Sequence, residues 1–167
     1  MKDQEIDRIA TMIYEAPLGE YIGRDGARIF AERCAGESHL KDGEFLYRKG
    51  DTTTSFHIVT QGQLVFVKEK AHEQGEAIIH MLDKGDLVGE LCFIDQTPHV
   101  LSARATGDVS LLRFDAKDIN PLITEQPMLM FQFMRAIVKR SHHVASVIGE
   151  QESELRRYIA TGGRGRS

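Results

Sequence analysis

The feature that most constrains the fold is a run of short apolar segments, separated by glycine-containing turns, from Ser38 to Phe114. The segments are rich in Val, Ile, Leu and Phe, and the turns recur roughly every eight to twelve residues. Glycine supplies the positive φ that tight turns demand. Short strands joined in this way are typical of an antiparallel sandwich or barrel. We predict the strands EFLYR, SFHIVT, QLVFVKEK, EAIIHML, VLSARAT and VSLLRF.

Helical patterns flank the predicted strands on both sides. Residues 3–15 carry apolar side chains at helical spacing, and a second helix is expected near residues 25–33. After an N-cap at Asp115, a helical stretch ends before Pro127, which suits the first turn of a long helix that continues to about Ala160.

These patterns predict a mainly β fold with flanking helices. The architecture expected is a double-stranded β-helix (jelly-roll) barrel with N-terminal helices and a long C-terminal helix. The predicted divisions are an N-terminal helical segment 1–33, a β-barrel 34–114, C-terminal helices 115–160 and a disordered tail 161–167.

The long helix carries a heptad pattern. Its a and d positions are Met134, Ile137, Ser141, Val144, Ile148, Gln151, Leu155 and Tyr158. Because most of these are apolar or aromatic, the pattern predicts a coiled-coil homodimer through this helix. The e positions Phe131, Val138, Ala145 and Ile159 would then pack on the barrel. The alternative left open is a helix buried against its own domain.

Composition excludes several classes of protein. The formal charge of −4 argues against bulk attraction to nucleic acid. Two cysteines, Cys34 and Cys92, are too few for a disulfide framework or a Cys-rich metal site. The chain has no apolar run of roughly 18 residues and no signal-peptide pattern at its start. We expect a cytoplasmic protein with no membrane contact, no direct DNA binding and no cofactor.

Catalytic motifs are absent from the sequence. The histidines outside the predicted long helix are scattered singly, and neither a Gly-x-Ser-x-Gly motif nor a Walker loop occurs. We therefore expect that the chain is not an enzyme. The pattern leaves open a haem sensor that uses a histidine and Cys92.

The stretch GELCFIDQTPHVLSARAT, residues 89–106, suggests a site for a small anion. It combines a flexible glycine with the start of a short helix, where backbone N–H groups are free. Gly89 would let a ligand approach the backbone closely. Glu90 would repel a phosphate directly, so its useful role would be to accept hydrogen bonds from ligand hydroxyls; the alternative left open is that Glu90 only caps a turn or pairs with a cation.

The order of these motifs resembles that of the cyclic-nucleotide-binding domain family. LKDGEFLYRKGD, FHIVTQGQLVFV and GDLVGELCFIDQTPHVLSARAT match three family motifs in order and at similar spacing. The resemblance implies a ligand such as cyclic AMP or cyclic GMP, with Glu90 accepting a hydrogen bond from the ribose. The ligand-binding residues that it implies are Gly89, Glu90, Leu91, Cys92, His99 and Val100.

The sequence departs from the family pattern at two places. His99 stands where the family has an arginine that pairs with the cyclic phosphate, and Arg104 is predicted to point to the other face of its strand. Losing such a charged hydrogen bond costs roughly 1.5 to 3 kcal/mol. With His99 as the phosphate contact, binding should tighten at pH 6. Base-recognition positions of the family fall on Val144 and Ala145, which lack polar side-chain groups.

Two functions compete at this stage. The first is a stand-alone regulatory sensor that binds a cyclic nucleotide or a related small anion, weakly because of His99, and signals through a dimeric C-terminal helix to a separate effector protein. Only about seven residues follow Ala160, too few for a DNA-reading helix-turn-helix. The second is a ligand-independent dimeric scaffold with a vestigial pocket.

Overall fold

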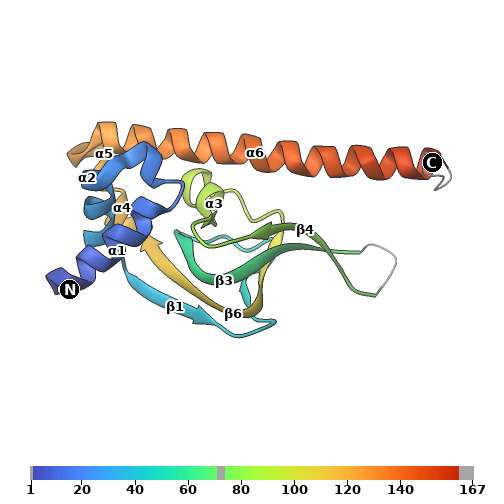
Figure 1. The fold of residues 1–167 in the computed structure, drawn as a ribbon, viewed down its shortest axis with the longest axis horizontal. Coiled ribbons are helices and arrows are strands. Elements are labelled where there is room, and N and C mark those ends of the chain that lie inside the picture. Colours follow the sequence, from blue (N-terminus) through green and yellow to red (C-terminus); the bar gives the residue numbers. More distant parts are fainter. Residues whose placement is uncertain (1, 71–73, 162–167) are drawn as a thin grey trace.

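A computed structural model of the chain describes residues 2–70 and 74–161. A curled antiparallel sheet forms the body, helices pack over one end, and one long helix runs along the body and continues past it (Figure 1). The helices are α1 Asp3–Glu15, α2 Gly19–Glu32, α3 Glu90–Asp95, α4 Ala116–Ile119, α5 Leu122–Glu125 and α6 Pro127–Ala160. The strands are β1 Gly36–Leu40, β2 Phe45–Tyr47, β3 Ser55–Glu69, β4 Glu76–Leu82, β5 Leu87–Val88 and β6 Ser102–Asp115.

Two long strands, β3 and β6, form the centre of the sheet. The order is β1-β6-β3-β4, with β2 also paired to β6 and β5 also paired to β3. The β3–β6 ladder is antiparallel and shifts register twice between Val59 and Gln63. Gly62, at φ 77°, lies in this irregular stretch, and a Cβ there would come within 2.2 Å of the carbonyl oxygen of Asp108. Gly62 therefore lets the two strands approach closely and bend, so that the first half of β3 pairs with β5 and the second half pairs with β4.

Two apolar clusters hold the fold together. One lies inside the barrel and includes Leu64, Leu82 and Leu111, all fully buried. The other joins the barrel to the helices, where the ring of Phe30 from α2 lies 5.0 Å from the ring of Phe133 of α6. Together these contacts fix the first half of α6 against the body, because burying such aromatic side chains removes a large apolar area from water.

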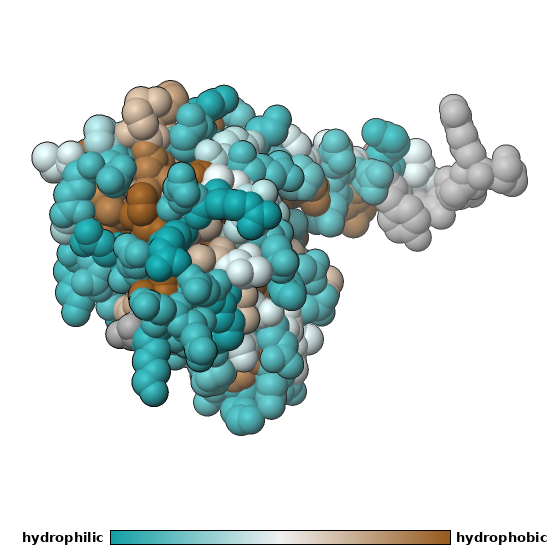
Figure 2. Space-filling model, turned by 60° about the vertical axis from the view of Figure 1, so that its left-hand side comes forward, coloured by the Kyte–Doolittle hydropathy of each residue, from teal (hydrophilic) through white to brown (hydrophobic). Residues whose placement is uncertain are grey.

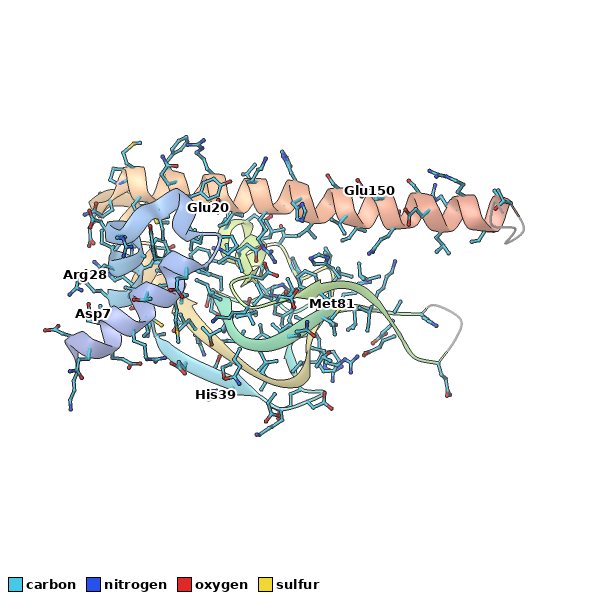
Figure 3. All side chains as sticks on the ribbon, in the orientation of Figure 1. Asp7, Glu20, Arg28, His39, Met81 and Glu150 are labelled. Carbon is cyan, nitrogen blue, oxygen red and sulfur yellow. The ribbon has the colours of Figure 1, made fainter. Side chains whose placement is uncertain are left out.

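Helix α6 turns most of the predicted coiled-coil seam toward its own chain. Ile137 is buried in the helix–barrel cluster, and Val144 faces the barrel side of the helix. The exposed apolar residues of α6 are instead Met128, Phe131, Val138, Leu155 and Ile159. The alternative of a helix packed against its own domain thus holds for positions such as Met134, Ile137 and Val144, whereas the a position Leu155 is exposed further along α6. Apolar patches follow the protruding half of α6 (Figure 2), which also carries exposed Glu150 (Figure 3).

The predicted fold class is confirmed, while several element boundaries differ. SFHIVT and QLVFVKEK are halves of the single strand β3, and VLSARAT and VSLLRF belong to β6. Strand β1, which pairs with β6, was not among the predicted strands. Helix α2 begins at Gly19 rather than near residue 25 and is interrupted at Gly23, where φ is 67°.

Two further expectations concern the ends of the helical region. Asp115 occupies the N-cap position of α4 but makes no capping hydrogen bond, because its Oδ1 accepts one from Arg113 Nε at 2.7 Å. Of the predicted tail, residues 162–167 lie outside the described residues. Over the ranges that the structure describes, none of the helices has the length and apolar composition needed to cross a bilayer.

Candidate functional site

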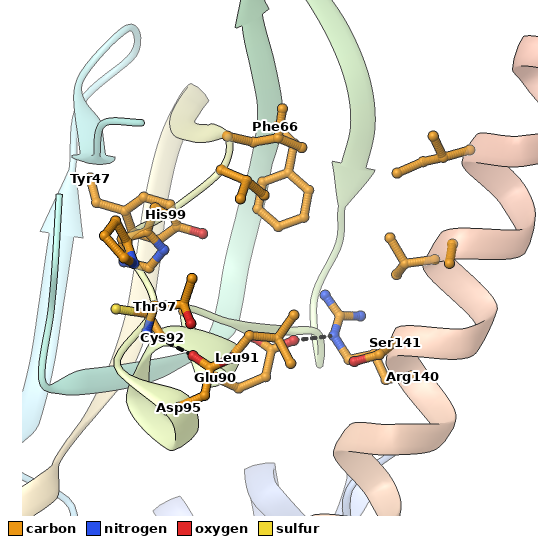
Figure 4. Close-up of a pocket in the computed structure, with 17 residues that line it drawn as sticks. Tyr47, Phe66, Glu90, Leu91, Cys92, Asp95, Thr97, His99, Arg140 and Ser141 are labelled. Atoms are coloured by element: carbon orange, nitrogen blue, oxygen red, sulfur yellow. Dashed lines mark hydrogen bonds and ion pairs between the residues drawn. The ribbon is translucent and has the colours of Figure 1, made fainter. Parts of the chain in front are cut away.

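A cavity of about 440 Å³ lies between α6 and the segment that we call the cassette, residues 86–101. Figure 4 shows cassette side chains on one side and α6 side chains on the other. All six predicted ligand-binding residues line the cavity: Gly89, Glu90, Leu91, Cys92, His99 and Val100. The other lining residues are Tyr47, Phe66, Asp95, Thr97, Pro98, Leu101, Arg140, Ser141, Val144, Ala145 and Ile148.

Gly89 turns the chain from β5 into α3. It adopts φ 81°, in the left-handed region, and a Cβ there would lie 3.3 Å from the carbonyl oxygen of Ser55. A side chain at this position would therefore be both strained and crowded. Helix α3 has only six residues, so the anion site expected from its N-terminus is a weak feature of this cavity.

Glu90 is the buried carboxylate of the site. It is 8% exposed, and its Oε1 lies 3.4 Å from Nε of Arg140, which reaches across from α6 (Figure 4). An ionised carboxylate at such a depth requires a compensating charge or hydrogen-bond donors. Arg140 supplies part of that compensation, and a ligand hydroxyl or amine could supply the rest.

Arg140 joins α6 to the cassette through two hydrogen bonds and one ion pair. Besides the contact with Glu90, its Nη2 donates a hydrogen bond to the carbonyl oxygen of Leu87 at 2.6 Å, and its Nη1 donates to Asp86 Oδ1 at 3.2 Å. We call this set of contacts the Arg140 latch. Sequence reasoning missed Arg140. No local sequence signal marks this residue, because Arg140 lies far from Glu90 in the chain and only the packing of α6 brings the two together.

His99 is held as a neutral, packed side chain. Its ring stacks on Tyr47, with ring centroids 3.5 Å apart and planes inclined by 8°. Its Nε2 lies 2.8 Å from the hydroxyl oxygen of Thr53, and its backbone N–H donates to the carbonyl oxygen of Asp51 at 2.9 Å. Burial lowers the pKa of His99, and the opposing effect of Asp51 is smaller. This lowered pKa works against stronger binding at pH 6 through a protonated His99.

The remaining predicted residues contribute in different ways. Cys92 is buried, and its Sγ accepts a hydrogen bond from the backbone N–H of Thr53 at 3.3 Å, which ties the cassette to the preceding loop. Leu91 and Val100 are exposed, and Val100 keeps 73% of its surface. Both therefore lie at the mouth of the cavity, where an entering ligand would cover them.

The α6 wall of the cavity is mainly apolar. Val144 and Ala145 line it, as does Ile148 one turn further on. Ser141 adds a hydroxyl oxygen that is buried and has no hydrogen-bond partner within the described chain. Arg104 does not line the cavity; its Nε pairs with Glu76 Oε2 at 3.2 Å instead. The sequence-based placement of Arg104 away from the site is consistent with this geometry.

The cavity contains no arrangement of side chains typical of a metal centre. No group of three or more His, Cys, Asp or Glu side chains suited to a metal ion occurs among residues 2–70 and 74–161. The polar side chains that line the cavity include Glu90, Arg140 and Ser141, and the rest of the wall is mainly apolar.

Comparison with known proteins relates the chain to other proteins at the levels of sequence and fold. The family model described as "Cyclic nucleotide-binding domain" matches residues 37–126. Patatin-like phospholipase domain-containing protein 6 of Pongo abelii is 26% identical over 142 residues, a match that covers 74% of this chain and 10% of the relative. The chain thus spans about a tenth of the length of that curated relative.

Two solved structures illustrate the shared fold. The regulatory domain of Toxoplasma gondii PKA with cAMP has a TM-score of 0.71 at 18% identity, covering 84% of this chain and 51% of the other. The regulatory subunit of a cAMP-independent protein kinase A from Trypanosoma brucei has a TM-score of 0.69 at 16% identity, covering 84% and 48%. The fold thus occurs in proteins described as cAMP-bound and as cAMP-independent. With the family model matching more than half of its residues, this chain belongs to the cyclic nucleotide-binding domain family.

Proposed function

We propose that the chain is a regulatory sensor domain in which a small ligand occupies the cavity and α6 reports its presence. The observation that carries this proposal is the cavity itself, because the cassette and α6 each supply one of its walls. A ligand held between two elements changes how they pack together. Binding therefore has a direct physical route to the long helix.

The Arg140 latch supports this route. Its three contacts connect one residue of α6 to three residues of the cassette: Asp86, Leu87 and Glu90. A ligand group that hydrogen-bonds to Glu90 would compete with or reinforce the contact to Arg140. The position of α6 would then depend on whether the cavity is filled.

Cyclic AMP and cyclic GMP are the first ligands to test, because one fold relative is described as bound to cAMP. A cyclic phosphate needs a positively charged partner, and His99 is neutral and already bonded to Thr53. We expect weak binding by the natural chain. A guanidinium at position 99 would add a charge-assisted hydrogen bond worth roughly 1.5 to 3 kcal/mol.

Calorimetric titration of the natural chain and of His99→Arg with both cyclic nucleotides tests the proposal. We expect His99→Arg to bind about tenfold to a few hundredfold more tightly than the natural chain. Ile78→Arg is the matched control, because it adds the same charge at an exposed position of β4 that does not line the cavity. If His99→Arg gains no affinity, or only as much as the control, the cassette does not serve as a site for a cyclic phosphate.

That negative result would favour a second function, a dimeric interaction scaffold. The observation behind it is the set of exposed apolar side chains on α6, among them Phe131, Val138 and Leu155. We propose that this face of α6 mediates a homodimer. If the chain is a sensor, the dimeric helix would also pass the signal to a separate effector protein. Light scattering at tens of micromolar should show a dimer, and Val138→Asp should yield a monomer. A monomeric natural chain would contradict the dimer.

A further inference from the structure

We infer that the natural ligand of this cavity is an uncharged molecule with an apolar body and at least one hydrogen-bond donor that reaches Glu90. This inference rests on the proposed function, because it assumes that the cavity binds a ligand, and it specifies the chemical class of that ligand. The sequence predicts an anionic ligand such as a cyclic nucleotide, whereas this inference assigns an uncharged one.

The charges around the cavity do not favour an anion. Within the described part of the chain, Arg140 is the one arginine or lysine that lines the cavity, whereas Glu90 and Asp95 both contribute carboxylates. Arg140 Nη1 and Nη2 already donate to Asp86 and to the carbonyl oxygen of Leu87, and its Nε lies 3.4 Å from Glu90 in an ion pair without a hydrogen bond. An anion would have to displace these acceptors and would leave buried Glu90 without its partner, which is costly.

Position 99 does not replace the missing cation. The ring of His99 is stacked on Tyr47, and its Nε2 is engaged by Thr53. The loop that contains Thr53 also holds the backbone of His99 through Gly50 and Asp51. His99 is therefore part of the wall, and turning it toward a phosphate would break both the stacking and the hydrogen bond.

The lining of the cavity suits an apolar body instead. Apolar side chains come from the cassette, from β3 and from α6, and they include Leu101, Phe66, Val144 and Ile148. A volume of about 440 Å³ falls within the range of roughly 300 to 1,000 Å³ that is usual for small-molecule sites. Burial of an apolar ligand there would gain free energy from the area removed from water.

Two buried oxygens would orient such a ligand. The carboxylate of Glu90 accepts no hydrogen bond from described residues beyond its ion pair with Arg140, and the hydroxyl of Ser141 has no partner there. A ligand O–H or N–H can donate to Glu90, and a second polar atom can bond to Ser141. Because the Ser141 hydroxyl oxygen is buried without a partner and Glu90 can accept further hydrogen bonds, a ligand that donates to them is favoured over a hydrocarbon.

Two fluorescent probes that differ by one anionic group test the inference. N-phenyl-1-naphthylamine is uncharged, with an aromatic body and one N–H donor, and 8-anilino-1-naphthalenesulfonate adds a sulfonate to the same body. We expect the full chain to bind the uncharged probe at least about tenfold more tightly than the sulfonate, a difference of about 1.4 kcal/mol. Equal or tighter binding of the sulfonate would overturn the inference.

Matched substitutions locate the bound probe. Val144→Phe fills the cavity and should weaken binding of the uncharged probe by about tenfold or more. Ile78→Phe adds a phenylalanine at an exposed position of β4 that does not line the cavity, and it should leave binding within about twofold. Ile148→Phe serves as a second filling variant, and circular dichroism confirms the fold of each. Probe binding that survives both filling variants would overturn the inference.

The two proposals fail in different ways. If His99→Arg gains no cyclic nucleotide affinity and the uncharged probe does not bind in the cavity, the sensor function fails and this inference fails with it. If His99→Arg gains affinity but the uncharged probe does not bind in the cavity, only this inference fails. Cyclic AMP binding to the natural chain more tightly than the uncharged probe would also overturn it.

Discussion

Removing the Arg140 latch should destabilise the protein by about 2 to 4 kcal/mol. In Arg140→Ala, the carbonyl oxygen of Leu87 loses a charged donor at 2.6 Å, a hydrogen bond worth roughly 1.5 to 3 kcal/mol. Glu90, which is 8% exposed, also loses its ion pair. Breaking a fully buried ion pair costs roughly 3 to 5 kcal/mol. Because the Arg140 side chain keeps 16% of its surface, the expected loss of stability is smaller than the sum of the hydrogen-bond and ion-pair costs.

Urea denaturation followed by circular dichroism measures this loss. Arg140→Lys keeps the charge but lacks the fork that reaches two acceptors, so it should recover only part of the stability. Arg135→Ala is the matched control on the same helix, since Arg135 is exposed and its hydrogen bond is to Gln132. A loss below about 0.5 kcal/mol in Arg140→Ala, similar to that of the control, would contradict the role assigned to the latch.

Two further predictions concern stability. Burial lowers the pKa of His57 to about 4 from its ordinary 6.5. Below about pH 6.5 the unfolded chain binds a proton at His57, whereas the folded chain does not bind it until about pH 4. The free energy of unfolding should therefore fall by about 3 kcal/mol as the pH drops from about 6.5 to about 4. Urea denaturation across this window should show a shallower pH dependence in His57→Leu, and an unchanged slope would contradict it. Gly62→Ala should lower stability by roughly 2 kcal/mol or more, because its Cβ would meet the carbonyl of Asp108 at positive φ. A midpoint in thermal denaturation equal to that of the natural chain would show that the strands bend elsewhere.

The barrel could be predicted from sequence because its signals are local. Glycine turns and apolar runs mark most of the strands, and Pro127 marks the start of α6. The joining of two predicted runs into β3 across Gly62 could not be predicted, because a glycine within a strand resembles a turn unless the opposing strand is known. Strand β1 was missed because its segment, GESHL, has few β-branched or aromatic residues and gains its place from pairing with β6.

The cassette side of the site was predictable, and the predicted base-recognition positions Val144 and Ala145 line the cavity, whereas Arg140 was missed. Gly89 and Glu90 belong to one contiguous motif, so their neighbourhood follows from the chain itself. Arg140 lies 50 residues further on, and only the packing angle of α6 brings it to Glu90. The rotation of α6 about its axis also decides which apolar stripe faces the barrel, and the heptad pattern alone does not distinguish a seam between helices from a seam with the chain's own core.

The environment of His99 shows a similar limit. The sequence places a histidine at the position of the expected arginine, but its protonation depends on burial and on partners from distant segments. Tyr47 is in β2 and Thr53 is in the loop before β3, so both lie far from His99 in the sequence. Their contacts hold the His99 ring in the cavity wall, where it is not free to bind a phosphate. For this reason the fold was predicted more fully than the ligand.

Amide hydrogen exchange along α6, with and without saturating N-phenyl-1-naphthylamine, tests most directly the central claim that an occupied cavity acts on this helix. Residues 140–148 form the α6 wall, so their amides should exchange more slowly when the cavity is filled, while amides of α1 should be unaffected. Val144→Phe should show no change on adding the probe. Binding of the probe in the cavity without any change in exchange over residues 140–148 would contradict the account.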